Sequence, residues 1–248
     1  MKIDLYLTPI PFGKVELEHK TVVIIDVLRS TTSICAALQA GAKAIIPTER
    51  PGEAGDMLAK IGRDITILAG EKNGVKIDNF QLGNSPAEFT SQAVGGKYVI
   101  MTTTNGTGIF SKTYNASTVI AGALVNIAVV AERIVKENND LVIVCAGREG
   151  HFSIEDTICG GMLIHQVGDT FHIDYSANDA GKLALLLYQT NQAKLRQTIE
   201  QGEHAKFLAS LGYANDIIIA TNVDSIPVLP ILKDGQLISE TTYPNKIA

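Results

Sequence analysis

Three short apolar runs, each ending in a polar cluster and followed by a helix-like pattern, constrain the fold of this chain more than any other feature. The runs with their clusters are VVIID (22–26), YVIMTTTNGT (98–107) and LVIVCAGREG (141–150). Apolar runs without alternation are typical of strands that are buried on both faces, as in parallel sheets. The sequence therefore predicts an α/β fold.

The order of the other patterns supports this fold class. Further strands are predicted at 3–8, 44–47, 65–71 and 119–121, and helices at 53–61, 85–89, 106–112, 127–136 and 154–166. Residues 22–47 read as strand, helix and strand with a right-handed crossover. We therefore expect a three-layer α/β/α architecture around a largely parallel or mixed central sheet.

The last third of the chain has a different pattern. Helices are predicted at 179–188 and 191–211, and β-like segments at 217–221 and 225–232, with a turn at Asp234-Gly235. We expect residues 1–248 to form a single α/β domain. A change of subdomain near 170–180 is expected to begin a partly distinct, helix-rich C-terminal portion.

Composition and charge exclude several functional classes. The net charge of the 248 residues is −5, so no general basic field is expected to attract nucleic acid or an acidic membrane. No apolar run reaches the ~20 residues of a membrane span, and the N-terminal residues do not resemble a leader peptide. The three cysteines form no CxxC pair and are expected as buried free thiols. We expect a cytoplasmic protein, and a homo-oligomer because many enzymes are symmetric assemblies.

The first polar cluster supplies candidate catalytic residues. Ligands in open α/β sheets lie beyond the carboxyl ends of the strands, so the three clusters are expected to form one site for a small anionic substrate and a hard metal ion. Asp26 could hold a divalent cation or attack phosphorus, and Arg29 offers donors that fit phosphate oxygens. Two alternatives stay open: Asp26 as a cap of the next helix, and Arg29 as a partner that only neutralises Asp26.

Hydroxyl-rich helix starts are the expected substrate-binding elements. Ser30, Thr31 and Thr32 open the first helix, where free backbone N–H groups favour an anion. The candidates in the second cluster are Thr103, Thr104, Asn105, Gly106 and Thr107. The glycine permits close approach of the backbone, although Asn-Gly is also a common turn.

The third cluster contains a cation followed by two adjacent acids. Arg148 directly follows the strand and its CAG extension, and Glu155 and Asp156 stand at the start of the next helix. Because Mg²⁺ prefers a few carboxylates together with water and substrate oxygens, the two acids are candidate ligands. The alternative is that they only complement the helix dipole.

Other polar residues give weaker signals. Glu71 ends another predicted strand and is a further candidate ligand, and His151 is either a proton donor or a solvated loop residue. His204 is expected on a helix surface. No HxxxH motif or Cys/His cluster predicts zinc, and no GxSxG, GxGxxG or GxxxxGK[ST] motif predicts a serine hydrolase or a nucleotide site.

Several segments together resemble a known family. The segments DVLRSTTSI, GNSP, TTTNGT and AGREGHFSIEDTICGG, with the later EHAKFLASLGYANDI, are similar to the 2-phosphosulfolactate phosphatases from about residue 20 to near residue 232. The resemblance implies an α/β fold of its own type. It also implies Mg²⁺-dependent hydrolysis of (R)-2-phospho-3-sulfolactate to sulfolactate and phosphate, a step of coenzyme M biosynthesis.

With this substrate, we expect Asp26, Glu155 and Asp156 to hold Mg²⁺. Arg29 and the hydroxyl-rich helix starts are expected to hold phosphate, and Arg148 the carboxylate or sulfonate. Whether Asp26 forms a phospho-enzyme or directs water stays open, because Leu28 stands where haloacid-dehalogenase-type phosphatases have a second Asp.

Other activities also stay open. They are the hydrolysis of another phosphorylated 2-hydroxy acid, a transferase or isomerase reaction on phosphorylated carboxylic acids, and non-catalytic binding of small organic anions.

Overall fold

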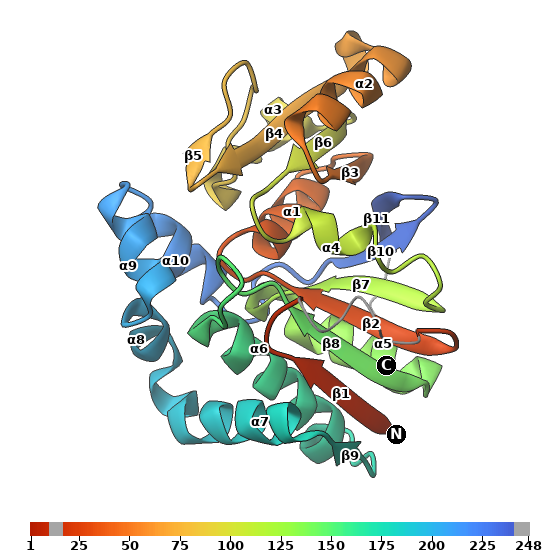
Figure 1. The fold of residues 1–248 in the computed structure, drawn as a ribbon, viewed down its shortest axis with the longest axis vertical. Coiled ribbons are helices and arrows are strands. Elements are labelled where there is room, and N and C mark those ends of the chain that lie inside the picture. Colours follow the sequence, from red (N-terminus) through yellow and green to blue (C-terminus); the bar gives the residue numbers. More distant parts are fainter. Residues whose placement is uncertain (10–16, 241–248) are drawn as a thin grey trace, which may run out of the picture.

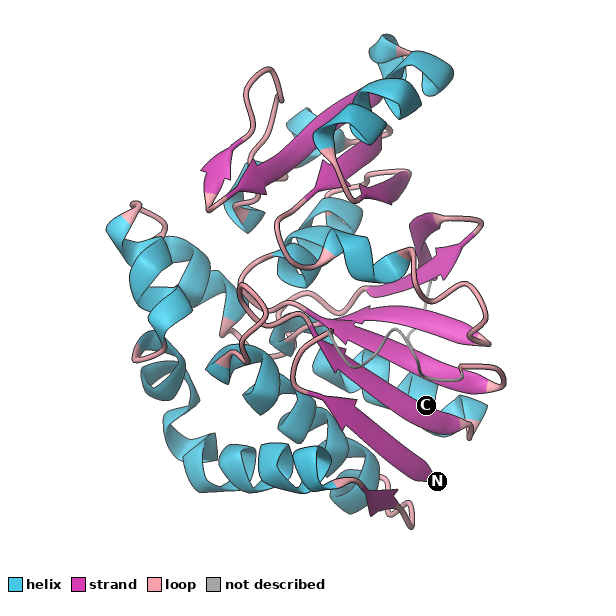
Figure 2. Ribbon diagram, in the orientation of Figure 1, coloured by secondary structure: helices cyan, strands magenta, loops and turns pink. Residues whose placement is uncertain are grey.

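The computed structural model describes residues 1–9 and 17–240. Within these ranges eleven strands form one mixed sheet in the order β5-β4-β6-β3-β11-β10-β7-β2-β8-β1-β9 (Figures 1 and 2). The strands are β1 (Lys2–Tyr6), β2 (Lys20–Ile25), β3 (Ala44–Thr48), β4 (Thr66–Lys72), β5 (Val75–Lys76), β6 (Tyr98–Thr102), β7 (Thr118–Gly122), β8 (Asp140–Cys145), β9 (Ser176–Ala177), β10 (Leu229–Lys233) and β11 (Gln236–Glu240).

Two parallel blocks make up most of the sheet. One block contains β1, β8, β2 and β7, and the other contains β3, β6 and β4. The antiparallel hairpin β10–β11 joins the blocks through one residue pair at each junction, Ile231 with Ile120 and Leu237 with Ile45. The carboxyl ends of both blocks face the side of the molecule where α9 and α10 lie (Figure 1).

Helices cover both faces of the sheet, which confirms the predicted three-layer arrangement. They are α1 (Ser30–Gln39), α2 (Pro51–Ile61), α3 (Ser91–Val94), α4 (Thr107–Phe110), α5 (Ile127–Glu137), α6 (Ile154–His165), α7 (Asp179–Asn191), α8 (Leu195–Glu200), α9 (Glu203–Ser210) and α10 (Ala214–Ala220). α5 and α6 pack on the first block, α2 packs on the second, and α1 lies between the two blocks (Figure 1).

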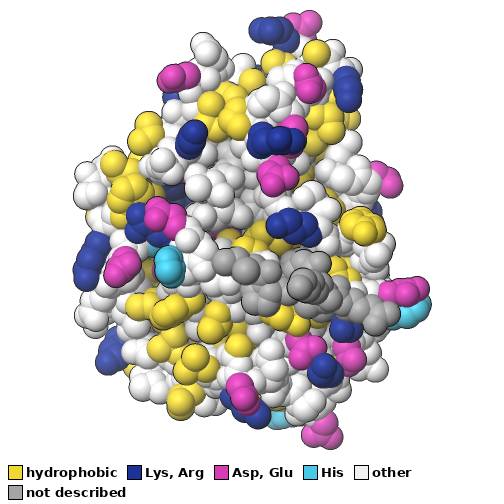
Figure 3. Space-filling model, viewed as in Figure 1, with side chains coloured by type: hydrophobic (Ala, Val, Ile, Leu, Met, Phe, Trp, Pro, Cys, Tyr) yellow, Lys and Arg dark blue, Asp and Glu magenta, His cyan; other side chains and the backbone are white. Residues whose placement is uncertain are grey.

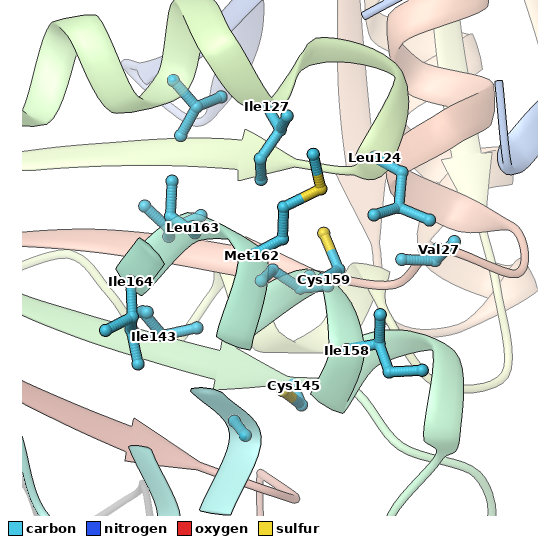
Figure 4. Packing of buried hydrophobic residues seen from close by; sticks show 14 of the residues in the cluster. Val27, Leu124, Ile127, Ile143, Cys145, Ile158, Cys159, Met162, Leu163 and Ile164 are labelled. Carbon is cyan, nitrogen blue, oxygen red and sulfur yellow. The ribbon is translucent and has the colours of Figure 1, made fainter. Parts of the chain in front are cut away.

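Burial on both faces explains the continuous apolar run in β2. Val23 and Ile25 belong to the core shared with α5 and α6, whereas Val22 and Ile24 belong to the core around α1. Successive side chains of a strand point to opposite faces, so a strand covered on both sides needs apolar residues at every position. Figure 4 shows the first core, in which Cys159 and Met162 of α6 lie close to Leu124 and Ile127.

The C-terminal portion corrects three predicted elements. Residues 217–221, predicted as β-like, belong mostly to α10, in which Ile217 and Ala220 are buried and Ile218 is 47% exposed. A three-residue spacing of buried positions is helical, and a short apolar run alone does not distinguish it from a strand. The predicted helix 191–211 is divided at Gly202, which is the N-cap of α9. The predicted β-like segment 225–232 becomes a strand only at Leu229, and this strand continues to Lys233.

The surface and the cysteines agree with the composition. Acidic and basic side chains are mixed on the face shown in Figure 3. All three cysteines are buried and free, as predicted. In the described part of the chain, no helix combines the length and the apolar character that crossing a membrane requires.

Candidate active site

Four strand-end loops, the segment at Asn84 and one helix line a small cavity, here called the inner cavity. The loops follow β2, β4, β6 and β8, and the helix is α9. The volume of the inner cavity is about 30 Å³. Its lining residues are Asp26, Leu28, Arg29, Glu71, Asn73, Gly74, Asn84, Thr104, Asn105, Arg148, Glu149, His204, Phe207 and Leu208. The structure thus brings members of all three polar clusters together.

Asp26 is the central buried acid of this cavity. Asp26 directly follows β2 in the sequence, and the residue is 5% exposed. Burial is the largest cause that raises the pKa of Asp26 to about 6; nearby Glu71 and Glu155 act in the same direction. The charge of His204 and the Ser30 N–H, which donates to Asp26 Oδ1 at 3.2 Å, lower it. Asp26 therefore changes charge close to neutral pH, as catalytic carboxylates often do.

The hydroxyl groups at the start of α1 mostly serve the loop itself. Thr31 Oγ1 donates to Asp26 O at 2.8 Å and accepts from Asp26 N at 3.0 Å, and Thr32 Oγ1 donates to Val27 O at 2.8 Å. By contrast, Ser30 Oγ is buried without a hydrogen-bond partner among the described residues. Of the three predicted hydroxyls, Ser30 alone has its oxygen uncommitted.

The TTTNGT loop brings backbone against Asp26. A Cβ atom on Gly106 would lie 2.4 Å from Asp26 Oδ2 and 2.9 Å from Ser30 Oγ. This contact explains why the position needs glycine. Thr103 and Thr107 instead form a reciprocal pair at the start of α4, with Thr103 N donating to Thr107 Oγ1 at 3.0 Å and Thr107 N to Thr103 Oγ1 at 3.2 Å. Of the predicted residues in this loop, Thr104 and Asn105 line the cavity.

Glu71 organises the opposite wall of the inner cavity. Its Oε1 accepts from Thr104 N at 2.7 Å, and its Oε2 accepts from Gly74 N at 2.6 Å. The carboxylate therefore joins the β4–β5 turn to the TTTNGT loop. The turn at residues 73–74 thus forms part of the wall of the site. The sequence alone indicates no role for this turn.

The two acids that open α6 have different partners. Asp156 Oδ1 accepts from Val27 N at 2.8 Å and Oδ2 from Gly147 N at 3.0 Å, so the carboxylate joins the β2–α1 and β8–α6 loops. Burial, Glu155 and Asp26 together raise the pKa of Asp156 well above its usual range. Glu155 Oε1 lies 2.9 Å from His204 Nδ1.

These partners bear on the expected metal ligands. Among residues 1–9 and 17–240, no three His, Cys, Asp or Glu side chains form a group that could hold a metal ion. The expected set of Asp26, Glu155 and Asp156 does not form such a group as its side chains lie, and its role as a metal site stays a prediction. Asp156 accepts from two backbone N–H groups, and Glu155 lies beside His204.

Arg29 is paired with an acid outside the predicted set. Its Nη1 donates to Asp216 Oδ2 at 2.9 Å, its Nη2 donates to Gly74 O at 3.1 Å, and its guanidinium lies 4.3 Å from the centre of the Tyr213 ring. Asp216 also accepts from Ser85 Oγ at 2.6 Å. Arg29 therefore pairs with Asp216 and not with Asp26, and this buried pair links the β2–α1 loop to α10.

One face of α9 completes the site. His204, Phe207 and Leu208 stand at positions i, i+3 and i+4, which share a helix face, and all three line the inner cavity. Phe207 carries the guanidinium of Arg148 on its ring at 4.3 Å from the ring centre. His204, expected on a surface, has a side chain that is only 13% exposed.

A larger cavity, here called the outer cavity, adjoins the inner one. Its volume is about 490 Å³, and it shares Arg148, Glu149 and His204 with the inner cavity. A volume of this size is typical of small-molecule sites. Arg148 and His204 thus stand at the border between a small acidic chamber and a substrate-sized space.

Sequence reasoning missed several lining residues. One of them is Asn84 of the GNSP segment, whose Oδ1 is buried without a hydrogen-bond partner among the described residues. Asn73, Gly74, Phe207 and Leu208 carried no chemical signal of their own. His204 had one available signal, its position three and four residues before the apolar Phe207 and Leu208, which places it on the inward face of a helix.

Comparison with known proteins gives a consistent result. The family model for 2-phosphosulpholactate phosphatase matches residues 6–235. A protein of Caldanaerobacter subterraneus subsp. tengcongensis, named "Probable 2-phosphosulfolactate phosphatase", is 40% identical over 220 residues, which cover 89% of this chain and 90% of that protein. Proteins of the same name from Clostridium beijerinckii and Clostridium acetobutylicum are 36% and 37% identical, cover 97% and 96% of this chain and are themselves covered to 100%. The matched range contains every residue that lines the two cavities.

Proposed function

The chain belongs to the 2-phosphosulfolactate phosphatase family of phosphoric monoester hydrolases, and on this premise we propose what it does. It hydrolyses (R)-2-phospho-3-sulfolactate, or the phosphate ester of a related 2-hydroxy acid, to the hydroxy acid and phosphate. The observation that carries this proposal is Asp26, a buried carboxylate with a pKa of about 6 where four strand-end loops meet. Such a group is suited to chemistry near neutral pH.

We further propose that the reaction needs Mg²⁺. Asp26 and Glu71 line the inner cavity, and Glu155 is close enough to raise the pKa of Asp26, so the chamber carries an excess of buried acid. The unpartnered oxygens of Ser30 and Asn84 are further hard ligands. Asp26 and Asn84 would hold the ion, with water and phosphate oxygens completing its shell, which is the mixture that Mg²⁺ prefers. When bound, the ion neutralises phosphate charge and stabilises the leaving alkoxide.

The roles of the residues follow from their positions. Asp26 acts in its ionised form, either on phosphorus or on the attacking water. Ser30 and Asn105 face phosphate oxygens, and Arg148 binds the carboxylate or sulfonate at the border of the two cavities. Arg29 has both terminal nitrogens engaged with Asp216 and Gly74, so it positions the loop that carries Asp26.

His204 is proposed as the proton donor to the leaving oxygen. It lines both the inner cavity, which contains Asp26, and the outer cavity, which is proposed to take the organic part of the substrate. Glu155 Oε1 lies 2.9 Å from Nδ1, which orients the ring. The leaving alkoxide of a 2-hydroxy acid is a poor leaving group and benefits from such a donor.

Phosphate release tests the proposal. The full chain with 2-phosphosulfolactate and Mg²⁺ is expected to release phosphate, excess chelator is expected to stop it, and Asp26→Asn is expected to lower kcat by at least about 100-fold. Calorimetry of Asp26→Asn with sulfolactate controls for binding. Tight binding by the wild type without any phosphate release would contradict the phosphatase and favour an anion-binding protein; conversion of the substrate without free phosphate would favour a transferase or isomerase.

The leaving group tests His204 separately. His204→Ala is expected to lower kcat for 2-phosphosulfolactate by about 100-fold and kcat for p-nitrophenyl phosphate far less, because nitrophenolate leaves without a proton. Equal losses on both substrates would show that His204 only holds the fold. Glu155→Gln, which keeps the shape of the partner, is expected to give the same pattern more weakly.

A further inference from the structure

We propose that the outer cavity is a binding site for the C2 side chain of the substrate, and that it accepts neutral apolar side chains larger than methyl. The inference rests on the proposed function and deepens it, because it names a substrate class: phosphate esters of 2-hydroxy acids with aromatic or branched alkyl side chains. The cavity is lined by Arg148, Glu149, His151, Phe152, Ser153, Ile154, Glu155, Glu203 and His204.

The arrangement of the two cavities matches the chemistry of such a molecule. C2 of a phosphorylated 2-hydroxy acid carries a phosphate ester, a carboxylate and one side chain. With phosphate near Asp26 in the inner cavity and the carboxylate on Arg148 at the border, the side chain points into the outer cavity. Arg148 is held in this place by its stacking on Phe207, at 4.3 Å from the ring centre.

The outer cavity is larger than the side chain of a three-carbon substrate requires. Its volume of about 490 Å³ lies in the range of cavities that bury drug-sized ligands. A three-carbon acid whose phosphate enters the inner cavity leaves most of that space to water. A larger side chain would replace this water and bury apolar surface.

The lining of the outer cavity includes an exposed aromatic ring. Phe152 is 57% exposed, an unusual state for a phenyl ring, and it lines the outer cavity together with Ile154. Two of the acids in the lining have cationic or histidine partners: Glu155 lies 2.9 Å from His204 Nδ1, and Glu149 lies 3.8 Å from Arg148 Nη2. The exposed ring of Phe152 is therefore available to a neutral apolar group.

A tight turn at Arg148–His151 fixes the positions of Arg148 and Phe152. Arg148 N donates to His151 O at 2.8 Å, and His151 N donates to Arg148 O at 2.8 Å. The two central residues, Glu149 and Gly150, have φ values of 52° and 81°, as in a type I′ turn. Arg148 and Phe152 thus leave opposite ends of one rigid turn, which sets the spacing between the carboxylate and the side chain that it recognises.

Two matched substrates test the proposal. For the full chain with Mg²⁺, kcat/KM for 2-phospho-3-phenyllactate is expected to exceed that for 2-phospholactate by about tenfold. Phe152→Ala is expected to bring this ratio close to one, and Phe152→Leu to keep part of it. Tyr114→Ala is the control, since Tyr114 is 83% exposed and lines neither cavity, and it is expected to leave the ratio unchanged. A wild-type ratio of one or less, or a ratio that Phe152→Ala does not lower, overturns the proposal.

Product binding separates this proposal from the phosphatase itself. By calorimetry, the Kd of 3-phenyllactate is expected to be about tenfold lower than that of lactate, and Phe152→Ala is expected to remove the difference. This measurement decides the side-chain site even if neither ester is hydrolysed, an outcome that would count against the proposed function alone. Equal Kd values for the two acids in the wild type overturn the side-chain site.

Discussion

At the scale of single residues, the site depends on the close contact between one carboxylate and one glycine. Asp26 Oδ1 accepts from the Ser30 N–H, and Oδ2 lies where a side chain at Gly106 would begin. The sequence indicated Asp26 as the central acid and Gly106 as a point of close approach. It did not indicate that Thr31, Thr32, Thr103 and Thr107 use their hydroxyls within their own loops, because a hydroxyl that caps a loop and one that binds a ligand look alike in a sequence.

Gly106→Ala tests this contact. The new methyl group would lie 2.4 Å from Asp26 Oδ2, so the carboxylate must move, and kcat/KM is expected to fall by about 100-fold or more. Gly108→Ala is the matched control two residues away, because a Cβ atom there comes no closer than 3.4 Å, to Glu49. Steady-state kinetics of both variants, with circular dichroism to verify folding, is the measurement. Equal activity of the two variants would contradict the assigned position of Asp26.

The pKa of Asp26 predicts how stability varies with pH. The pKa is about 6 in the fold and 3.8 as the ordinary value, so the folded state holds the extra proton between these pH values. Stability is therefore lost as the pH rises through this window, by about 3 kcal/mol, and does not change further above it. Asp26→Asn removes this loss. In urea titrations without metal, the variant is expected to be more stable than the wild type at pH 7.5 and not at pH 4.5.

The same charge predicts a metal effect. With the ionised Asp26 as the proposed ligand, Mg²⁺ is expected to raise the Tm of the wild type at pH 7.5, to raise it less at pH 5, and to leave Asp26→Asn unaffected. A Tm increase that is equal in the wild type and Asp26→Asn would place the ion elsewhere in the molecule.

At the scale of elements, the strands were the most predictable part and the C-terminal helices the least. β2, β6 and β8 are buried on both faces, and that burial produces an apolar run that is hard to mistake. α10 was misread because its run of three isoleucines is as apolar as a strand, and only the neighbouring elements decide which face is covered. The contribution of α9 was missed for the same reason: its inward face is defined by loops distant in sequence.

At the scale of the whole molecule, α1 connects the layers to the site. It is buried between the two strand blocks, and the loop that leads into its first turn carries Asp26 and Arg29 to the inner cavity. Arg29 then extends the connection to α10 through Asp216. The C-terminal helices are thus attached to the sheet by a buried ion pair as well as by apolar packing.

Asp216→Ala tests this attachment. Both side chains of the pair are at most 3% exposed, so the variant leaves a buried guanidinium without its acid, and the free energy of unfolding is expected to fall by about 3–5 kcal/mol. Lys182→Ala breaks an exposed pair with Asp179 and is expected to cost at most about 1 kcal/mol. Urea unfolding measures both. A double variant, Arg29→Met with Asp216→Leu, is expected to lose less stability than Asp216→Ala, and a larger loss would contradict the role of the pair.

The distribution of the site along the chain has a consequence for biosynthesis. Asp26, Glu71 and Asn105 leave the ribosome early, whereas His204, Phe207 and Asp216 follow only near the end of translation. Until then Glu155 lacks its partner His204, and Arg148 lacks the ring of Phe207. Arg29 likewise lacks its partner Asp216. A nascent chain can therefore pair β1, β8, β2 and β7 before the site is complete, and the site is completed only once α9 and α10 have been synthesised.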